Sequence, residues 1–302
     1  MSSTTTAAPR ISPIEAAQQA VERTRRQLFP FRFDRWLALG FVAFLDQCGR
    51  AMGSGGGTGG GGSSTRGGGA GFAPSWPGWL DVGWTLGLAL CAVVLVLVVV
   101  VLVVWLNSRG VFMYVDNVAT GGAHVVRTWR RNRTQARDYF VWNLGLILLT
   151  LAGVLALVVP GVMLGFSLHQ HGFRLSRVLA LVFLGGLLVC VLIVASLASV
   201  LLRDLVAPIQ FRRKVGCRQA LEVAVGMVVA HPAAFLVYVL LKAVFMAVLM
   251  AVGFLAGCLT CCLGFLPIVR QTLLQPIYYF ERAWSLELLR QLGEDPFVAA
   301  EP

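Results

Sequence analysis

Charged residues are scarce in this chain, because only 13% of its 302 residues are Asp, Glu, Lys or Arg, whereas soluble domains carry about 25%. Apolar residues make up 57% of the sequence, and the mean hydropathy is +0.77. These values exclude an ordinary soluble domain and indicate an integral membrane protein. The first 35 residues also lack the apolar centre of a cleavable signal peptide, so we expect the retained spans to direct insertion.

Lysine is almost absent, with 2 residues against 23 arginines, although the formal net charge is +11. Abundant Arg, Gly, Ala and Val are also typical of a GC-rich genome, so the charge does not by itself indicate nucleic acid, and we expect no nucleic-acid partner.

A glycine-rich tract covers residues 53–71, but no strand precedes it and Gly-Lys-Ser or Gly-Lys-Thr occurs nowhere. This argues against a phosphate-binding loop and predicts a flexible outer loop.

Patterns of catalytic and metal-binding residues are missing as well. No nucleophile, base and orienting group share an activating motif, and the seven cysteines form no disulfide framework. His169 and His171, together with Cys258 and Cys261, are ligand types that suit zinc or copper. Both cysteines lie in apolar helix ends, where cysteine is commonly a small hydrophobe. We therefore expect no catalytic site, no cofactor and no metal, and we leave open an outer-side disulfide.

Long uncharged runs are what the chain has in abundance, and about 20 apolar residues suffice for a helix to cross a bilayer. They predict an all-α fold, a polytopic transmembrane helical bundle of about six spans within a membrane domain at 36–280. The spans are expected at 36–52, 82–106, 139–164, 176–202, 233–256 and 262–280. The first is the weakest, and Pro160 is expected to mark the end of the third. The run 243–269 is either one helix or part of a hairpin.

The segments that flank the spans are polar or basic. Ser12 to Glu15 has the spacing of a capping box, with Pro at the first helical position, and opens an amphipathic helix in a leader at 1–35. This helix either lies on the membrane surface or packs on the protein's own cytoplasmic loops. Basic segments at 107–138 and 203–218 are expected to be interfacial cytoplasmic segments, and residues 281–302 a cytoplasmic tail.

The placement of cations predicts the orientation of the chain. With six spans, 19 Lys or Arg residues fall in the leader, the two basic segments and the tail, and four fall on the opposite side. Both termini are therefore expected to be cytoplasmic.

Two cations, Lys242 and Arg270, fall near the middle of predicted spans. A charge at the bilayer centre costs about 3 kcal/mol on insertion scales, so each needs a partner, a wet cavity or a route to the interface. Asp46, Asp204 and Glu281 are the candidate partners. If no carboxylate reaches the two cations, they form an anion-attracting cavity suited to a lipid headgroup or a phosphate; otherwise they are structurally paired or reach the interface.

Several motifs together carry a family resemblance. Phe33 to Phe41 (FDRWLALGF) precedes the glycine-rich loop, Asp204 to Ile209 (DLVAPI) follows the fourth span, and Pro276 to Phe280 closes the sixth. The chain resembles a group of largely uncharacterised prokaryotic six-helix membrane proteins, similar to the membrane domain that precedes some glycerophosphoryl diester phosphodiesterases. The resemblance implies the cytoplasmic (inner) membrane of a prokaryote. It carries over no catalytic residues, because the phosphodiesterase chemistry resides outside that domain.

The sequence thus favours a non-enzymatic membrane protein that organises lipid or partner proteins at the cytoplasmic membrane. Membrane lipids and a membrane protein are the partners that this function implies. The alternative hypothesis is a transporter or permease for an anionic or amphiphilic solute, which would use Lys242 and Arg270.

Overall fold

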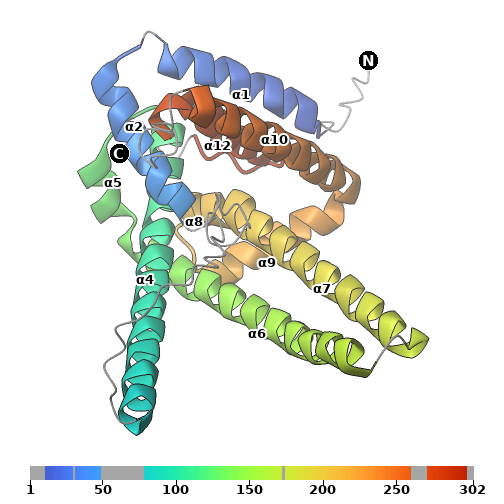
Figure 1. The fold of residues 1–302 in the computed structure, drawn as a ribbon. Coiled ribbons are helices and arrows are strands. Elements are labelled where there is room, and N and C mark those ends of the chain that lie inside the picture. Colours follow the sequence, from blue (N-terminus) through green and yellow to red (C-terminus); the bar gives the residue numbers. More distant parts are fainter. Residues whose placement is uncertain (1–10, 30, 49–77, 172–173, 260–270, 298–302) are drawn as a thin grey trace, which may run out of the picture.

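The computed structural model describes residues 11–29, 31–48, 78–171, 174–259 and 271–297, and these form helices with no strand among them (Figure 1). Four helical stretches are long and apolar enough to cross a membrane. They are Leu86–Thr120, Arg133–Ser167, Leu175–Arg213 and Pro232–Leu255. The prediction of an all-α polytopic membrane protein is therefore confirmed.

The helices extend further than the uncharged runs that predicted them. They are α4 (Gly78–Thr120), α6 (Arg133–His171), α7 (Leu175–Leu201) and α10 (Pro232–Leu259). Pro160 lies inside α6 and does not end it, which is consistent with the tolerance of membrane helices for proline. The basic segment 107–138 is helical for most of its length, because α4 continues to Thr120 and α5 (Val125–Arg131) precedes α6.

The environment of α4 changes abruptly at Asn107. From Leu86 to Leu102 almost every described side chain is exposed, whereas Asn107 to Ala119 are all buried. The buried part is covered by α2 (Phe33–Cys48), which runs antiparallel to it. The guanidinium of Arg35 donates to the carbonyl of Gly121, and Asn107 Nδ2 donates to the carbonyl of Asp46 at 2.6 Å.

The expected first span at 36–52 is described only as far as Cys48, and this part lies beside the buried half of α4 instead of its apolar half. The expected sixth span at 262–280 is described only from residue 271. Its last six residues begin α12 (Gln275–Gln291), most of which is buried in protein. The glycine-rich tract lies outside the described residues.

A single buried region joins the helices. We call it the junction core; it comprises α2, residues 107–120 of α4, the π-helix η1 (Leu202–Val206), α8 (Ala207–Arg213) and α12. In Figure 1 the apolar part of α4 and the α6–α7 hairpin diverge from this region. The connecting helix α9 (Cys217–Ala230) leads from α8 to α10. Polar side chains therefore gather where the helices meet, and apolar side chains face outward along the spans.

The N-terminal helix α1 (Pro13–Leu28) packs on α12. Its cap is the predicted one, because Ser12 Oγ accepts from the Glu15 amide at 3.3 Å. Its buried face meets α12, where Trp284 Nε1 donates to the carbonyl of Pro13 at 2.9 Å and Arg23 pairs with Glu287 at 2.7 Å. Of the two interpretations of the amphipathic helix, the structure shows packing on the protein itself.

Close approach of α2 and α4 requires glycine at position 110. A Cβ there would lie 2.8 Å from Leu45 Cβ and closer still to the backbone of Leu45 and Asp46. Gly110→Ala should therefore destabilise the protein by about 1–3 kcal/mol through overpacking, measured as a lower Tm in detergent. Gly145→Ala in α6 is the control, because its Cβ would meet nothing within 4 Å. Equal melting temperatures for the two variants would contradict the α2–α4 contact.

Candidate functional site

Six ionisable side chains from four elements meet where α10 contacts the junction core, each no more than 9% exposed. They are Asp46 of α2, Arg203 and Asp204 of η1, Lys242 of α10, and Glu281 and Arg282 of α12. We call them the charge network. Three carboxylates face three cations, so the network carries no net charge when all six are ionised.

The π-helix η1 supplies two members of the network from consecutive positions. It follows α7 without a break, and all five of its residues are buried. Neighbouring residues of a helix point in different directions, so Arg203 and Asp204 meet different partners. Short π-helices within longer helices are frequent at functional sites. Here the π-helix directs a cation toward α2 and α12, and a carboxylate toward α10.

One half of the network surrounds Asp46, which is fully buried. The guanidinium of Arg203 donates to both of its carboxylate oxygens, and Arg282 Nη2 donates to Oδ1 at 2.9 Å. Arg203 Nη1 also reaches Glu281 Oε1 at 3.0 Å. Arg282 Nη1 donates to the Arg203 carbonyl at 3.0 Å. Asp46 therefore ties α2 to both η1 and α12.

The other half surrounds Lys242, the cation expected in the middle of a span. Its ammonium forms an ion pair with Asp204 and lies 3.4 Å from Glu281 Oε1. Tyr238, one turn earlier in α10, donates to Asp204 Oδ2 at 2.9 Å. Two of the three candidate carboxylates thus lie against Lys242, whereas Asp46 pairs with arginines. Arg270 lies outside the described residues.

Arg203 and Arg282 are the members that sequence reasoning missed, because both were counted among the cytoplasmic cations. The signal that points to them is a pair of acid–arginine neighbours: Arg203 with Asp204 follows the long uncharged run 178–202, and Glu281 with Arg282 follows the shorter uncharged run 271–280. Consecutive residues of a helix point in different directions. If both charges of such a pair are buried, each therefore needs an oppositely charged partner on another helix.

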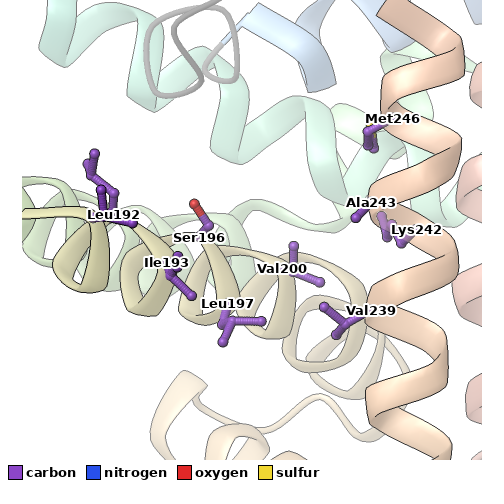
Figure 2. Close-up of a pocket in the computed structure, with 10 residues that line it drawn as sticks. Leu192, Ile193, Ser196, Leu197, Val200, Val239, Lys242, Ala243 and Met246 are labelled. Atoms are coloured by element: carbon purple, nitrogen blue, oxygen red, sulfur yellow. The ribbon is translucent and has the colours of Figure 1, made fainter. Parts of the chain in front are cut away.

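An apolar groove of about 350 Å³ lies where α7 meets α10, and Lys242 is at its inner edge (Figure 2). Most of its lining is aliphatic, and Ser196 is the other polar residue that lines it. Met246 lies further along α10, on the side that Ala243 also lines. The groove can therefore accept apolar chains, whereas the Lys242 ammonium is already paired with carboxylates of the protein.

Nucleophilic and metal-binding groups are not assembled in the described part of the chain. Burial raises the pKa of the Cys217 thiol to about 12, so this thiol stays protonated near neutral pH. Burial also lowers the pKa of Lys214, and the nearby charge of Arg131 lowers it further. Among residues 11–29, 31–48, 78–171, 174–259 and 271–297, no group of three His, Cys, Asp or Glu side chains is placed to hold a metal ion.

A family model matches residues 11–288, and its description is "Family of unknown function (DUF7544)". The chain belongs to this family. The matched region runs from the start of α1 to near the end of α12, so it includes every member of the charge network. No curated protein and no solved structure matches the chain.

Substitutions at two paired members of the charge network should have non-additive effects on the free energy of unfolding. Lys242→Met leaves Asp204 buried without its cation, and loss of one partner of a buried pair costs about 3–5 kcal/mol. Asp204→Asn should destabilise similarly, and the double variant should be clearly more stable than the sum of the two losses predicts. Unfolding in mixed detergent micelles measures all three.

Arg218→Met is the control, because its pair with Glu222 is exposed, and exposed pairs contribute at most about 1 kcal/mol. Additive losses for the Lys242 and Asp204 variants, or losses no larger than that of the control, would show that the pair is not the constraint described here.

Proposed function

We propose that this chain is a non-enzymatic integral membrane protein that organises lipids or partner proteins at the cytoplasmic membrane of a prokaryote. The observation that carries the proposal is the distribution of its surfaces. Large apolar side chains are exposed along α4, α6, α7 and α10, whereas six of the buried charges are collected in one neutral network. Extended apolar surface of this kind serves contacts with lipid or with other membrane proteins.

The proposal includes six crossings with both termini in the cytoplasm. The packing of α1 on α12 supports this topology, because it brings the two ends of the described chain together, as an even number of crossings would. The cation count assigns that side to the cytoplasm. The resemblance to the membrane domain of some glycerophosphoryl diester phosphodiesterases supports the same topology and a prokaryotic origin.

The chemistry of the described residues supports a non-enzymatic role. The α7–α10 groove is lined almost entirely by apolar side chains. The most buried of the described cysteines, Cys217, has its thiol held protonated. No cofactor or nucleic acid enters the proposal, since neither the sequence nor the described surfaces supply a motif that would hold one.

The alternative is a transporter or permease for an anionic or amphiphilic solute. The observation that favours it is the position of Lys242 at the inner edge of the α7–α10 groove. In this proposal a solute anion would compete with Asp204 and Glu281 for the ammonium, and Arg270 would supply the second positive charge.

Proteoliposomes distinguish the two proposals. We expect the protein to increase energy transfer between donor- and acceptor-labelled phospholipids, because it gathers them, and to leave the efflux of entrapped phosphate at the rate of protein-free vesicles. Unchanged energy transfer would contradict lipid organisation. Saturable phosphate efflux that Lys242→Gln with Arg270→Gln abolishes, while circular dichroism stays unchanged, would establish the permease instead. Arg174→Gln serves as the control substitution, since Arg174 is an exposed cation at the start of α7.

A further inference from the structure

A second groove lies between α4 and α6, away from the charge network. Its volume is about 560 Å³, and its lining is apolar, with Val98, Val101 and Trp105 from α4 and Phe140 from α6. The α4 residues are three and four positions apart, so they share one face of that helix. This face belongs to the exposed apolar half of α4, which places the groove at the depth of the lipid chains.

Arg109 stands one turn beyond Trp105 on the same face of α4 and is only 8% exposed. Its guanidinium lies beside a pair of indole rings that contact each other edge to face, 5.4 Å from the centroid of Trp105 and 5.3 Å from that of Trp129. It donates to the Trp129 carbonyl at 3.4 Å. No carboxylate among the described residues lies within ion-pair distance of it, so within this part of the chain Arg109 is a buried cation without an anionic partner.

The start of α6 adds two further cations beside this position. Arg133 and Arg137 are exposed, and they precede Phe140 by seven and three residues, so all three share one face of α6. The start of α6 follows α5, whose Trp129 contacts Arg109, and α6 itself packs on α4. Neither exposed arginine has an ion pair within the described residues. By contrast, Arg212 and Arg213 share Glu294, and Arg218 pairs with Glu222.

We propose that the α4–α6 groove binds one anionic phospholipid of the cytoplasmic leaflet, with an acyl chain along Val98, Val101 and Trp105 and the phosphate at Arg109, Arg133 and Arg137. This inference rests on the proposed function and names the lipid class and its site. Two independent observations converge on it: an apolar groove at chain depth, and unneutralised cations at the end of the groove nearest the junction core. Arginine binds phosphate through a planar fork of donors, and cations beside an anionic leaflet are each favourable for binding.

Native mass spectrometry of the purified full-length protein with added lipid tests the proposal. We expect phosphatidylglycerol to bind more tightly than phosphatidylcholine of the same chain length. Arg133→Gln with Arg137→Gln should weaken phosphatidylglycerol binding by roughly tenfold to thirtyfold and leave phosphatidylcholine unchanged. Both side chains are exposed and have no ion pair among the described residues, so this variant should fold normally. Arg174→Gln, near the other end of the α6–α7 hairpin, is the matched control and should bind as wild type does.

The groove and the buried arginine have tests of their own. Val101→Trp should fill the groove and weaken binding of both lipids, whereas Leu149→Trp, on an exposed part of α6, should not. Arg109→Gln should remove most of the preference for phosphatidylglycerol. Inorganic phosphate at the same concentration should not displace the lipid, because it lacks the chain; full displacement would show a phosphate site without a lipid site.

Equal affinity of wild type and the arginine variants for phosphatidylglycerol would overturn this assignment. A different result would contradict the proposed function, namely unchanged energy transfer between labelled lipids in proteoliposomes. That function requires lipids to gather, whichever residues contact them. Gathering of lipids without dependence on Arg109, Arg133 and Arg137 would therefore retain the function and reject the site.

Discussion

The structure depends on the neutrality of its buried charge network. Carboxylates and cations removed from water cost several kcal/mol each unless they are paired with good geometry, and here three of each sign meet. Asp46 needs two arginines, and Lys242 needs Asp204, so no member can leave without stranding another. Because the members come from α2, η1, α10 and α12, the network fixes elements that are far apart in the sequence. The contact of α1 with α12 then joins the two ends of the described chain.

The same constraint explains where apolar surface remains. Residues 86–106 of α4 are apolar. Polar residues follow from Asn107 onward, and this part of the helix is enclosed by α2 and α12. No residue of α7 is buried, and burial begins where η1 follows it at Leu202, immediately before Arg203 and Asp204 of the network. Once the polar groups have been gathered in the junction core, the outer parts of the spans have few polar groups that require burial. They can diverge, as Figure 1 shows, and leave grooves between them whose walls are apolar.

The sequence predicted the elements better than their connections. Hydropathy predicted six spans, and four long apolar helices are found among the described residues. The Ser12 cap predicted the start of α1, and the cost of a buried ammonium predicted that Lys242 needs a partner, a wet cavity or a route to the interface. The sequence did not predict that α4 continues as a helix past Asn107. A helical segment whose polar residues are buried against another helix has the same composition as a polar loop. Nor did the sequence predict the pairing of Asp46 with Arg282, 236 residues away, because no local pattern records which distant cation neutralises a carboxylate.

The two grooves differ in one respect that separates the functional hypotheses. At the α7–α10 groove the cation already has Asp204 and Glu281, so an incoming anion must replace interactions that the protein provides. At the α4–α6 groove Arg109 has two aromatic rings and a carbonyl, but no carboxylate among the described residues. Aromatic rings and carbonyls stabilise a guanidinium without neutralising its charge. An anion that binds at Arg109 therefore forms a new ion pair and does not have to displace a carboxylate among the described residues. A stable lipid contact is therefore favoured at Arg109, whereas any role of Lys242 in moving a solute would first require the charge network to open.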